Sequence, residues 1–234
     1  MKKILYSVAL AACCMGTMTS CSDFLDASNK SNVTAKQSFA TKEGLNNLVN
    51  NAYQHLQNVY AAPLFTSCFS AGTDMYADAR NKMNEALNTY ETLTPENTDI
   101  KNLYTYLYSG IRAANSVSYY AQTAQVDDKT KGQLVGEARV LAAYEYYLLV
   151  NNFGGVPIMK DFLTTADTGY PKSSAEDVYA YIISELEDVI SKNVLQASTA
   201  TKGGGRISQE TAKAILAKTY LSAAWDLNKQ EYFS

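Results

Sequence analysis

The chain is poor in the residues that most catalytic and metal sites require. Its 234 residues include one histidine, one tryptophan and four cysteines. A catalytic triad or a zinc centre needs histidine or paired cysteines in a set, and the sequence has no HExxH, GxSxG or CxxC motif. Carboxylates are plentiful, so composition leaves open an acid pair of the glycosidase kind. We predict a protein that is not an enzyme and that uses no metal or cofactor.

Long apolar runs and basic clusters are also missing. The apolar stretch at 4–12 is shorter than the roughly 20 residues that a membrane-spanning helix needs. Lysine and arginine total 20 against 23 aspartate and glutamate residues, and they are not gathered in any patch. Such a charge pattern offers no footprint for a phosphate backbone, so we exclude nucleic acid as a partner.

The first 20 residues have the layout of a secretory signal. Lys2 and Lys3 form a basic start, residues 4–12 form an apolar centre, and small residues follow. The sequence Met18-Thr19-Ser20-Cys21 is similar to a bacterial lipobox, in which the cysteine becomes the lipidated N-terminus. We therefore predict a lipoprotein signal peptide at 1–20 and a lipidated, palmitate-bearing tether at 21–40. Ordinary signal cleavage, with Cys21 unmodified, is the alternative.

Loss of the signal would leave little cysteine chemistry. Cys13 and Cys14 leave with it and Cys21 carries lipid, so Cys68 would be the remaining thiol. A single thiol makes no internal disulfide, and we expect Cys68 to be a small buried hydrophobe. His55 has no cysteine or carboxylate at ligand spacing, so we predict that it is structural.

Beyond residue 41 the apolar residues recur at steps of three and four, which is the period of an amphipathic helix. We predict helices at about 42–60, 99–124 and 209–225, and a further one from 174 onward. Asp127 and Asp128 open the central helix, and its firm part is expected after Gly132. The connection at 61–98 breaks the pattern with Pro63, Gly72 and Pro95. We expect it to be irregular, and connections of this length are usually functional. The predicted fold class is all-α with long irregular loops.

The run from Gly136 to Ile158, GEARVLAAYEYYLLVNNFGGVPI, is the predicted centre of the fold. Apolar residues fall on almost every face of its helical part, which is typical of a helix packed against neighbours on several sides. Gly154 and Gly155 can adopt the left-handed conformation that ends a helix, and Pro157 cannot continue one. We predict a buried central helix, a tight exit and a short extended segment.

The same run carries a family resemblance. Glu137-Ala138-Arg139-x-Leu141-x-Ala143-Tyr144, followed by Phe153-Gly154-Gly155-Val156-Pro157, resembles the central motif of the SusD/RagB family. Its members are outer-membrane lipoproteins that capture nutrients, usually glycans, for a partner SusC-like TonB-dependent transporter. The resemblance implies a surface-exposed, lipid-anchored protein that binds an oligosaccharide and delivers it to such a transporter. Two alternatives stay open: the same scaffold binding peptides, as in the RagB branch, or a tethered helical-repeat scaffold with protein partners only.

Two helices repeat a spacing of small and aromatic residues. Ala138-x-x-Leu141-x-x-Tyr144 in the central helix matches Ala214-x-x-Ala217-x-x-Tyr220 in the last predicted helix. Tetratricopeptide-like repeats use this spacing to pack paired helices. We predict a tetratricopeptide-like helical-repeat scaffold, an α-solenoid, with 41–234 as a SusD-like N-terminal helical domain. Because family members continue about as far again beyond Ser234, we expect the chain to be the truncated N-terminal part of a longer protein.

Tyrosine is abundant, with 18 residues. A buried tyrosine needs a partner for its hydroxyl, whereas an exposed one offers a flat apolar face with a polar tip, which suits sugar rings. We expect Tyr53, Tyr104, Tyr144 and Tyr220 to fill helix interfaces, so they are poor candidates for ligand binding.

The resemblance implies a shallow oligosaccharide site, shared between N-terminal loops and residues beyond this chain. The matching region here is 71–98. Its candidate ligand-binding residues combine aromatic faces with hydrogen-bonding groups: Asp74, Tyr76, Asp78, Arg80, Tyr90 and Asn97. We favour Tyr76, Arg80 and Tyr90, since Arg80 can grip two hydroxyls or a carboxylate with its fork of donors.

Replacing Cys21 tests the lipoprotein prediction. Fatty-acid labelling of cells that make the protein should mark the wild type and miss Cys21→Ser, because the lipid is attached through the sulfur. Two or more long acyl chains anchor a protein stably, so the variant should also leave the membrane fraction. Cys68→Ser is the matched control and should label like the wild type. Equal labelling of Cys21→Ser and the wild type would contradict the prediction.

Overall fold

The computed structural model describes residues 35–61, 63–76, 85–165, 169–198 and 205–229. The elements from Lys36 onward belong to one unit. The helices are α3 (Ala35–Ser38), α4 (Lys42–Tyr60), α5 (Leu64–Phe69), α6 (Glu85–Thr89), α7 (Thr98–Ala121), α8 (Asp128–Phe153), α9 (Ala175–Lys192) and α10 (Gln209–Leu227). Within the described ranges there is no strand, only an isolated bridge between Thr73 and Tyr76. The predicted all-α class is confirmed.

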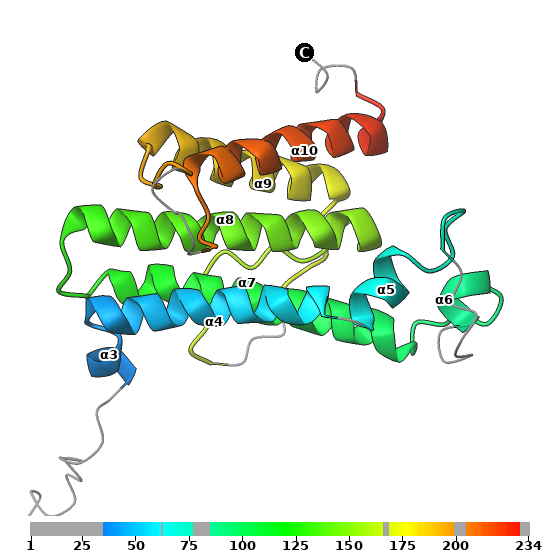
Figure 1. The fold of residues 1–234 in the computed structure, drawn as a ribbon, viewed down its shortest axis with the longest axis horizontal. Helices are drawn as coiled ribbons and strands as arrows, with labels where there is room; N and C mark the ends of the chain where they lie inside the picture. Colours follow the sequence, from blue (N-terminus) through cyan, green and yellow to red (C-terminus); the bar gives the residue numbers. More distant parts are fainter. Residues whose placement is uncertain (1–34, 62, 77–84, 166–168, 199–204, 230–234) are drawn as a thin grey trace, which may run out of the picture. The chain divides into compact units, whose positions relative to one another are not determined.

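The long helices pack against one another in chain order (Figure 1). α7 lies along α4, α8 packs on α7, and α9 and α10 follow on the other side of α8. In a helical-repeat solenoid each unit contacts mainly its neighbours, and this order is of that kind. α4 also reaches α8, so α8 is enclosed by helices that come before and after it in the chain.

Side-chain caps set where the helices begin. Thr41 Oγ1 accepts a hydrogen bond from Gly44 N at 3.1 Å at the start of α4. At the start of α9, Ser174 and Asp177 form a complete capping box, in which each side chain accepts from the other residue's backbone N–H. These bonds satisfy N–H groups that have no partner within the helix.

The connection at 61–98 is less irregular than expected, because α5 and α6 lie in it. Phe65 and Phe69 stack one turn apart on α5, with ring centroids at 5.3 Å, and Leu64 is buried beneath them. Pro63 does not break this helix but stands at its N-cap. The missing N–H of a proline costs nothing there, since the first amides of a helix have no acceptor in any case.

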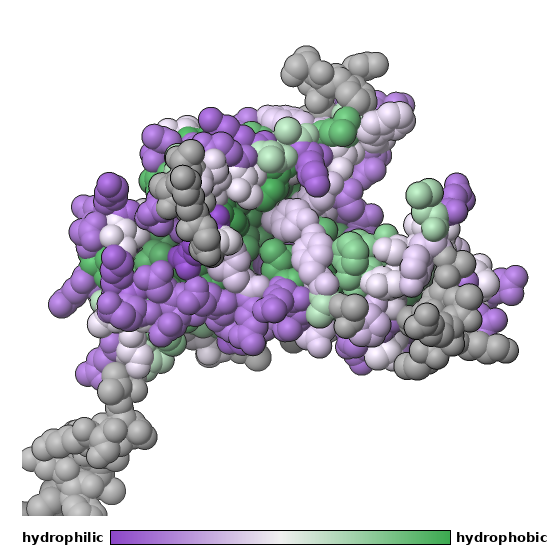
Figure 2. Space-filling view, viewed as in Figure 1, coloured by the Kyte–Doolittle hydropathy of each residue, from purple (hydrophilic) through white to green (hydrophobic). Residues whose placement is uncertain are grey.

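α8 is buried along most of its length, as predicted. Four of its larger apolar side chains are at most 3% exposed: Leu141, Tyr146, Leu149 and Val150. On the face that Figure 2 shows, apolar side chains also line a hollow of about 290 Å³ that α4, α8 and α10 enclose, with Leu56, Leu141 and Ile215 among its walls. The core therefore follows α8 and opens to the surface beside α10.

Glu137 is buried on α8 and is well paired. Its Oε2 lies 2.7 Å from Nε of Arg206 and accepts from the Tyr53 hydroxyl at 3.2 Å. Its Oε1 accepts from Gln133 Nε2 at 3.1 Å. Ile207 N in turn donates to the Tyr53 hydroxyl at 2.7 Å. One buried carboxylate thus ties the segment before α10 to both α4 and α8.

Glu145 on α8 is the opposite case. Its side chain has no exposed surface, and neither carboxyl oxygen has a hydrogen-bond partner in the described part of the chain. It lies against Gly110 of α7, where an added Cβ would come within 1.7 Å of Glu145 Oε1. Glycine is therefore what allows α7 and α8 to approach here. Burial raises the pKa of the Glu145 carboxyl well above its ordinary value of 4.5.

The stability of the protein should therefore depend on pH through Glu145. The pKa of the Glu145 carboxyl is higher in the folded state than in the unfolded state. The protonated carboxyl therefore contributes its full stability below the unfolded-state pKa, about 4.3. It is lost as the pH rises toward the folded-state pKa, by up to about 1.4 kcal/mol per pH unit. We expect the free energy of unfolding of the wild type to fall between pH 4.5 and pH 7.5 relative to that of Glu145→Gln.

Urea unfolding at several pH values measures this difference. Glu96→Gln, which neutralises an exposed carboxylate, is the control and should follow the wild-type pH profile. If the free energies of unfolding of the wild type and Glu145→Gln change in parallel with pH, burial does not raise the pKa of the Glu145 carboxyl in the folded state.

Candidate functional site

Two glycines shape the exit from α8. Gly154 has a φ of 68°, which residues with a side chain rarely adopt. Gly155 lies against the residues before α9, since a Cβ there would come within 2.2 Å of the carbonyl oxygen of Ser173. Ser173 N also donates to Val156 O at 3.2 Å. The predicted tight exit is confirmed, and it holds the two ends of the α8–α9 connection together.

Side chains from α7 and α8 hold the first part of this connection. Tyr108 donates to Pro157 O at 2.7 Å, and Asn115 Nδ2 donates to Met159 O at 2.8 Å. Met159 N donates to the hydroxyl of Tyr146 at 2.6 Å. Burial raises the pKa of Tyr108, so its hydroxyl keeps the proton that it donates. This first part of the connection is thus fixed at several points, and we call it the wall.

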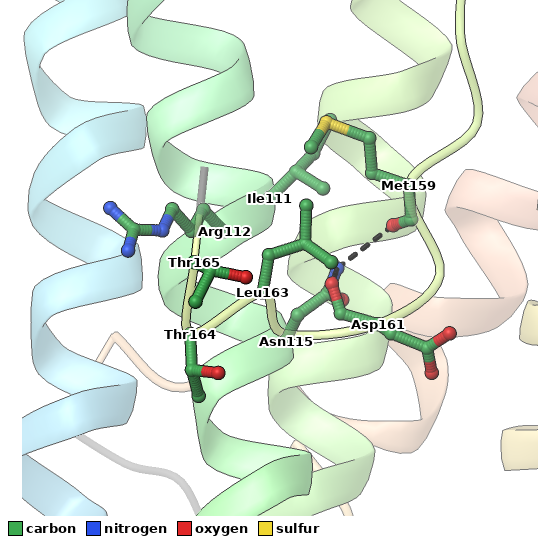
Figure 3. Close-up of a pocket in the computed structure, with 8 residues that line it drawn as sticks. All are labelled: Ile111, Arg112, Asn115, Met159, Asp161, Leu163, Thr164 and Thr165. Atoms are coloured by element: carbon green, nitrogen blue, oxygen red, sulfur yellow. Dashed lines mark hydrogen bonds between the residues drawn. The ribbon is translucent and has the colours of Figure 1, made fainter. Parts of the chain in front are cut away.

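A cavity of about 300 Å³, the Asn115 cavity, lies between α7 and this wall (Figure 3). Threonine hydroxyls and an amide line it beside apolar carbon. Figure 3 shows the Asp161 carboxylate and the Arg112 guanidinium directed away from each other. The lining residues are Ile111, Arg112, Asn115, Met159, Asp161, Leu163, Thr164 and Thr165.

Two further hollows adjoin Arg112. The tyrosine groove, about 450 Å³, follows α7 past Tyr104 and Tyr108 and is also lined by Tyr170. The α4–α7 cavity, about 380 Å³, is lined by residues of both helices and by Phe162. Arg112 lines all three spaces. All three also have other residues of α7 in their walls.

Tyr104 was expected to fill a helix interface, and it does so only in part. Its side chain is 37% exposed, while Leu103 next to it is fully buried. One residue corresponds to about 100° of rotation around a helix, so Leu103 takes the core position and Tyr104 turns outward. The Tyr104 ring packs edge-on against Phe153 with centroids at 5.3 Å, and its free face borders the tyrosine groove.

The predicted ligand-binding residues lie in different surroundings. Asp74 and Tyr76 are exposed in a turn after α5. Asp78 and Arg80 lie outside the described residues. Asn97 is the N-cap of α7, where its Oδ1 accepts from two backbone N–H groups at 3.0 and 3.2 Å. Its side chain therefore has a structural role, and only its Nδ2 is left to meet a ligand.

Tyr90 combines exposure with backbone strain. Its φ of 62° is in the left-handed region, which costs a residue other than glycine about 1–3 kcal/mol and is common at ligand sites. The side chain is 55% exposed, and its hydroxyl lies 3.5 Å from Gly72 O. The structure thus brings position 72 beside position 90 and leaves much of the Tyr90 ring accessible.

Other reactive groups are quiet. Among the described residues, no group of three or more His, Cys, Asp and Glu side chains could hold a metal ion. Burial raises the pKa of the Cys68 thiol to about 12, so the thiol stays protonated. Burial also lowers the pKa of His55, which keeps the imidazole neutral at pH 7. None of the helices in the described ranges is both long and apolar enough to cross a membrane.

Residues 23–221 match the model of a protein family described as SusD-like, starch-binding and associating with the outer membrane. The chain belongs to this family. The match covers most of the sequence, including the central motif and the exit from α8. The resemblance inferred from that motif is therefore confirmed, and with it the tetratricopeptide-like helical-repeat fold.

Relatives of this SusD-like chain are considerably longer. It is 28% identical over 190 residues to SusD-like protein P38 of Formosa agariphila, covering 79% of this chain and 36% of the relative. It resembles surface glycan-binding protein A of Bacteroides uniformis with 26% identity and a TM-score of 0.66, covering 77% of this chain and 42% of that one. The Bacteroides thetaiotaomicron protein of the same name, solved with laminarihexaose, has the same fold at 21% identity and a TM-score of 0.61, covering 78% and 39%. The chain thus spans about two fifths of the length of these proteins.

The charged residues of the family motif serve the fold of this SusD-like chain. Glu137 is the buried partner of Arg206. Arg139 pairs with Glu185 at 2.7 Å and with Asp188 at 2.5 Å, which joins α8 to α9. The charged side chains of the motif therefore hold the scaffold together.

Sequence reasoning gave no role to Arg112, Asn115 or Phe162. Arg112 and Asn115 lie one turn apart on α7, and neither carries a catalytic or ligand-binding motif in the sequence. Phe162 lies 50 residues further along the chain. Only the folding of the α8–α9 connection over α7 brings them together.

Asn115→Ala should loosen this wall. It removes the shorter of two hydrogen bonds to Met159 O and leaves the Tyr146 hydroxyl at 3.3 Å as the remaining donor. Loss of one such bond costs about 0.5–1.5 kcal/mol. We expect a lower urea midpoint and faster amide hydrogen exchange at 156–163. Asn151→Ala, which removes an exposed bond to Tyr147 O within α8, is the control and should change neither. Unchanged exchange at 156–163 in Asn115→Ala would show that the wall is held without it.

Proposed function

We propose that this SusD-like chain is the glycan-binding part of a lipid-anchored protein at the cell surface. It would capture an oligosaccharide and deliver it to a SusC-like TonB-dependent transporter in the outer membrane, with lipid on Cys21 as the anchor. The family match over residues 23–221 carries the proposal. The glycan-binding name of the Bacteroides uniformis relative and the laminarihexaose complex of the Bacteroides thetaiotaomicron protein support a saccharide ligand.

The proposed ligand site lies at 71–98. Tyr76 and Tyr90 are 43% and 55% exposed, so each offers a ring face to the apolar C–H groups of a sugar. Asp74 and Asp78 would accept hydrogen bonds from sugar hydroxyls, and Arg80 would donate two. The Nδ2 of Asn97 is a further donor at the end of the same stretch.

This arrangement suits binding and release. The described residues of 71–98 stand on an open surface, and sugar hydroxyls there would exchange bonds to water for bonds to protein at little net gain. Stacking on two tyrosines would supply much of the affinity. Such a complex dissociates readily, as delivery to a transporter requires, and no covalent bond of the ligand changes.

Three substitutions test this site. Tyr76→Ala, Arg80→Ala and Tyr90→Ala should each weaken binding of laminarihexaose about tenfold or more, which corresponds to ~1.4 kcal/mol, as measured by isothermal titration calorimetry. If a glycan array identifies a glycan that the protein binds more tightly, that glycan replaces laminarihexaose as the probe. Trp225→Ala removes an exposed aromatic side chain from α10 and should bind like the wild type.

The outcomes separate the alternatives. If all three variants bind like the wild type while circular dichroism reports intact helices, the glycan site is elsewhere. If the wild type binds members of a peptide library and no glycan on the array, the RagB-like alternative replaces the proposal.

A further inference from the structure

Arg112 differs from the other arginines in the described residues, which are Arg139 and Arg206. Those two pair with carboxylates at 2.5–2.7 Å. No ion pair in the described part of the chain includes Arg112. Its guanidinium instead lies 5.5 Å from the ring centroid of Phe162, a cation–π contact. The five N–H donors of this exposed side chain are therefore available to a ligand.

The guanidinium belongs to the α4–α7 cavity. In Figure 3 it is directed toward α4, away from Asn115 and Asp161. The cavity of about 380 Å³ is lined on the α4 side by Asn51 and His55 and on the α7 side by Ser109. Phe162 and Tyr120 add aromatic surface. This volume lies within the range of about 300–1,000 Å³ that is usual for small-ligand pockets.

The lining of this cavity includes a positive charge and no negative charge. No aspartate or glutamate is among its lining residues, whereas the Asn115 cavity has Asp161. His55 is neutral at pH 7 and its Nδ1 has no hydrogen-bond partner in the described ranges. The cavity thus combines one cation with neutral polar groups and aromatic carbon, and no carboxylate of its lining neutralises the cation. Such a cavity favours an anionic ligand that also has an apolar face.

We propose that the α4–α7 cavity is a second ligand site, which takes an acidic saccharide unit, either a uronic acid or a sulfated sugar. Arg112 would hold the carboxylate or sulfate with two parallel N–H bonds, and the Phe162 ring would pack on the C–H face of the sugar. Asn51 and Ser109 would bond to its hydroxyls. The saccharide nature of the ligand rests on the proposed function, but the site is separate from 71–98.

Calorimetry with charged and neutral probes tests this site. The wild type should bind trigalacturonic acid, which has carboxylates and no sulfate, or galactose 6-sulfate, which has a sulfate and no carboxylate, and whichever it prefers identifies the anionic group. Arg112→Gln should weaken that binding at least tenfold, and Arg112→Lys, which keeps the charge and loses the fork, should weaken it less. Phe162→Leu should also weaken it. Lys101→Gln, which removes another exposed cation from α7, is the control and should have no effect.

Laminarihexaose distinguishes this proposal from the previous one. Its binding should be unchanged in Arg112→Gln and weakened in Tyr90→Ala, whereas acidic probes should respond in the opposite way. Because Arg112 is exposed and has no ion pair in the described residues, Arg112→Gln should keep the wild-type circular dichroism and urea midpoint. The inference is overturned if the wild type binds neither acidic probe, if Arg112→Gln binds them like the wild type, or if it loses laminarihexaose equally.

Discussion

The middle of helix α8, from Leu134 to Val150, is largely buried, so a charged side chain there must find a partner on a neighbouring element or give up its charge. Glu137 takes the first course with Arg206 and Tyr53. Arg139, at the edge of the enclosed region, bridges to α9 through two carboxylates. Glu145 takes the second course, because burial raises its pKa and no donor reaches it. The position of every long helix follows from these contacts and from the apolar packing around them.

At two glycines the backbone approaches a neighbouring segment closely, and these contacts link the packing around α8 to the shape of the surface. Gly110 admits the Glu145 side chain, which brings α7 against α8. Gly155 admits the Ser173 carbonyl, which turns the α8–α9 connection back over α7. Tyr108, Asn115 and Tyr146 then fix that connection. The depressions along α7 are thus a consequence of core geometry.

The two proposed sites use tyrosine and arginine in different ways. At 71–98 the Tyr76 and Tyr90 side chains are exposed, so aromatic faces would dominate binding. In the α4–α7 cavity the lining includes Arg112 and no carboxylate, so charge would dominate. One chain could therefore hold a neutral and an acidic part of a saccharide on two surfaces. The family match by itself would suggest only the starch-binding description.

Local features of the sequence determined the fold class, the positions of the long helices and the family, but not the short helices α5 and α6. Each of these features depends on residues within one or two helical turns, so it can be recognised without a structure. Examples are the periodicity of 42–60, the all-round apolar run before Phe153 and the Gly154-Gly155-Val156-Pro157 exit. Tertiary structure decided the rest, because it depends on contacts between distant residues. Tyr53 and Glu137 are 84 positions apart, and Asn115 and Met159 are 44 apart. The outward turn of Tyr104, the capping role of Asn97 and the cavity at Arg112 arise from the same cause: helix periodicity shows which faces are apolar, but only packing decides which polar side chains share a surface.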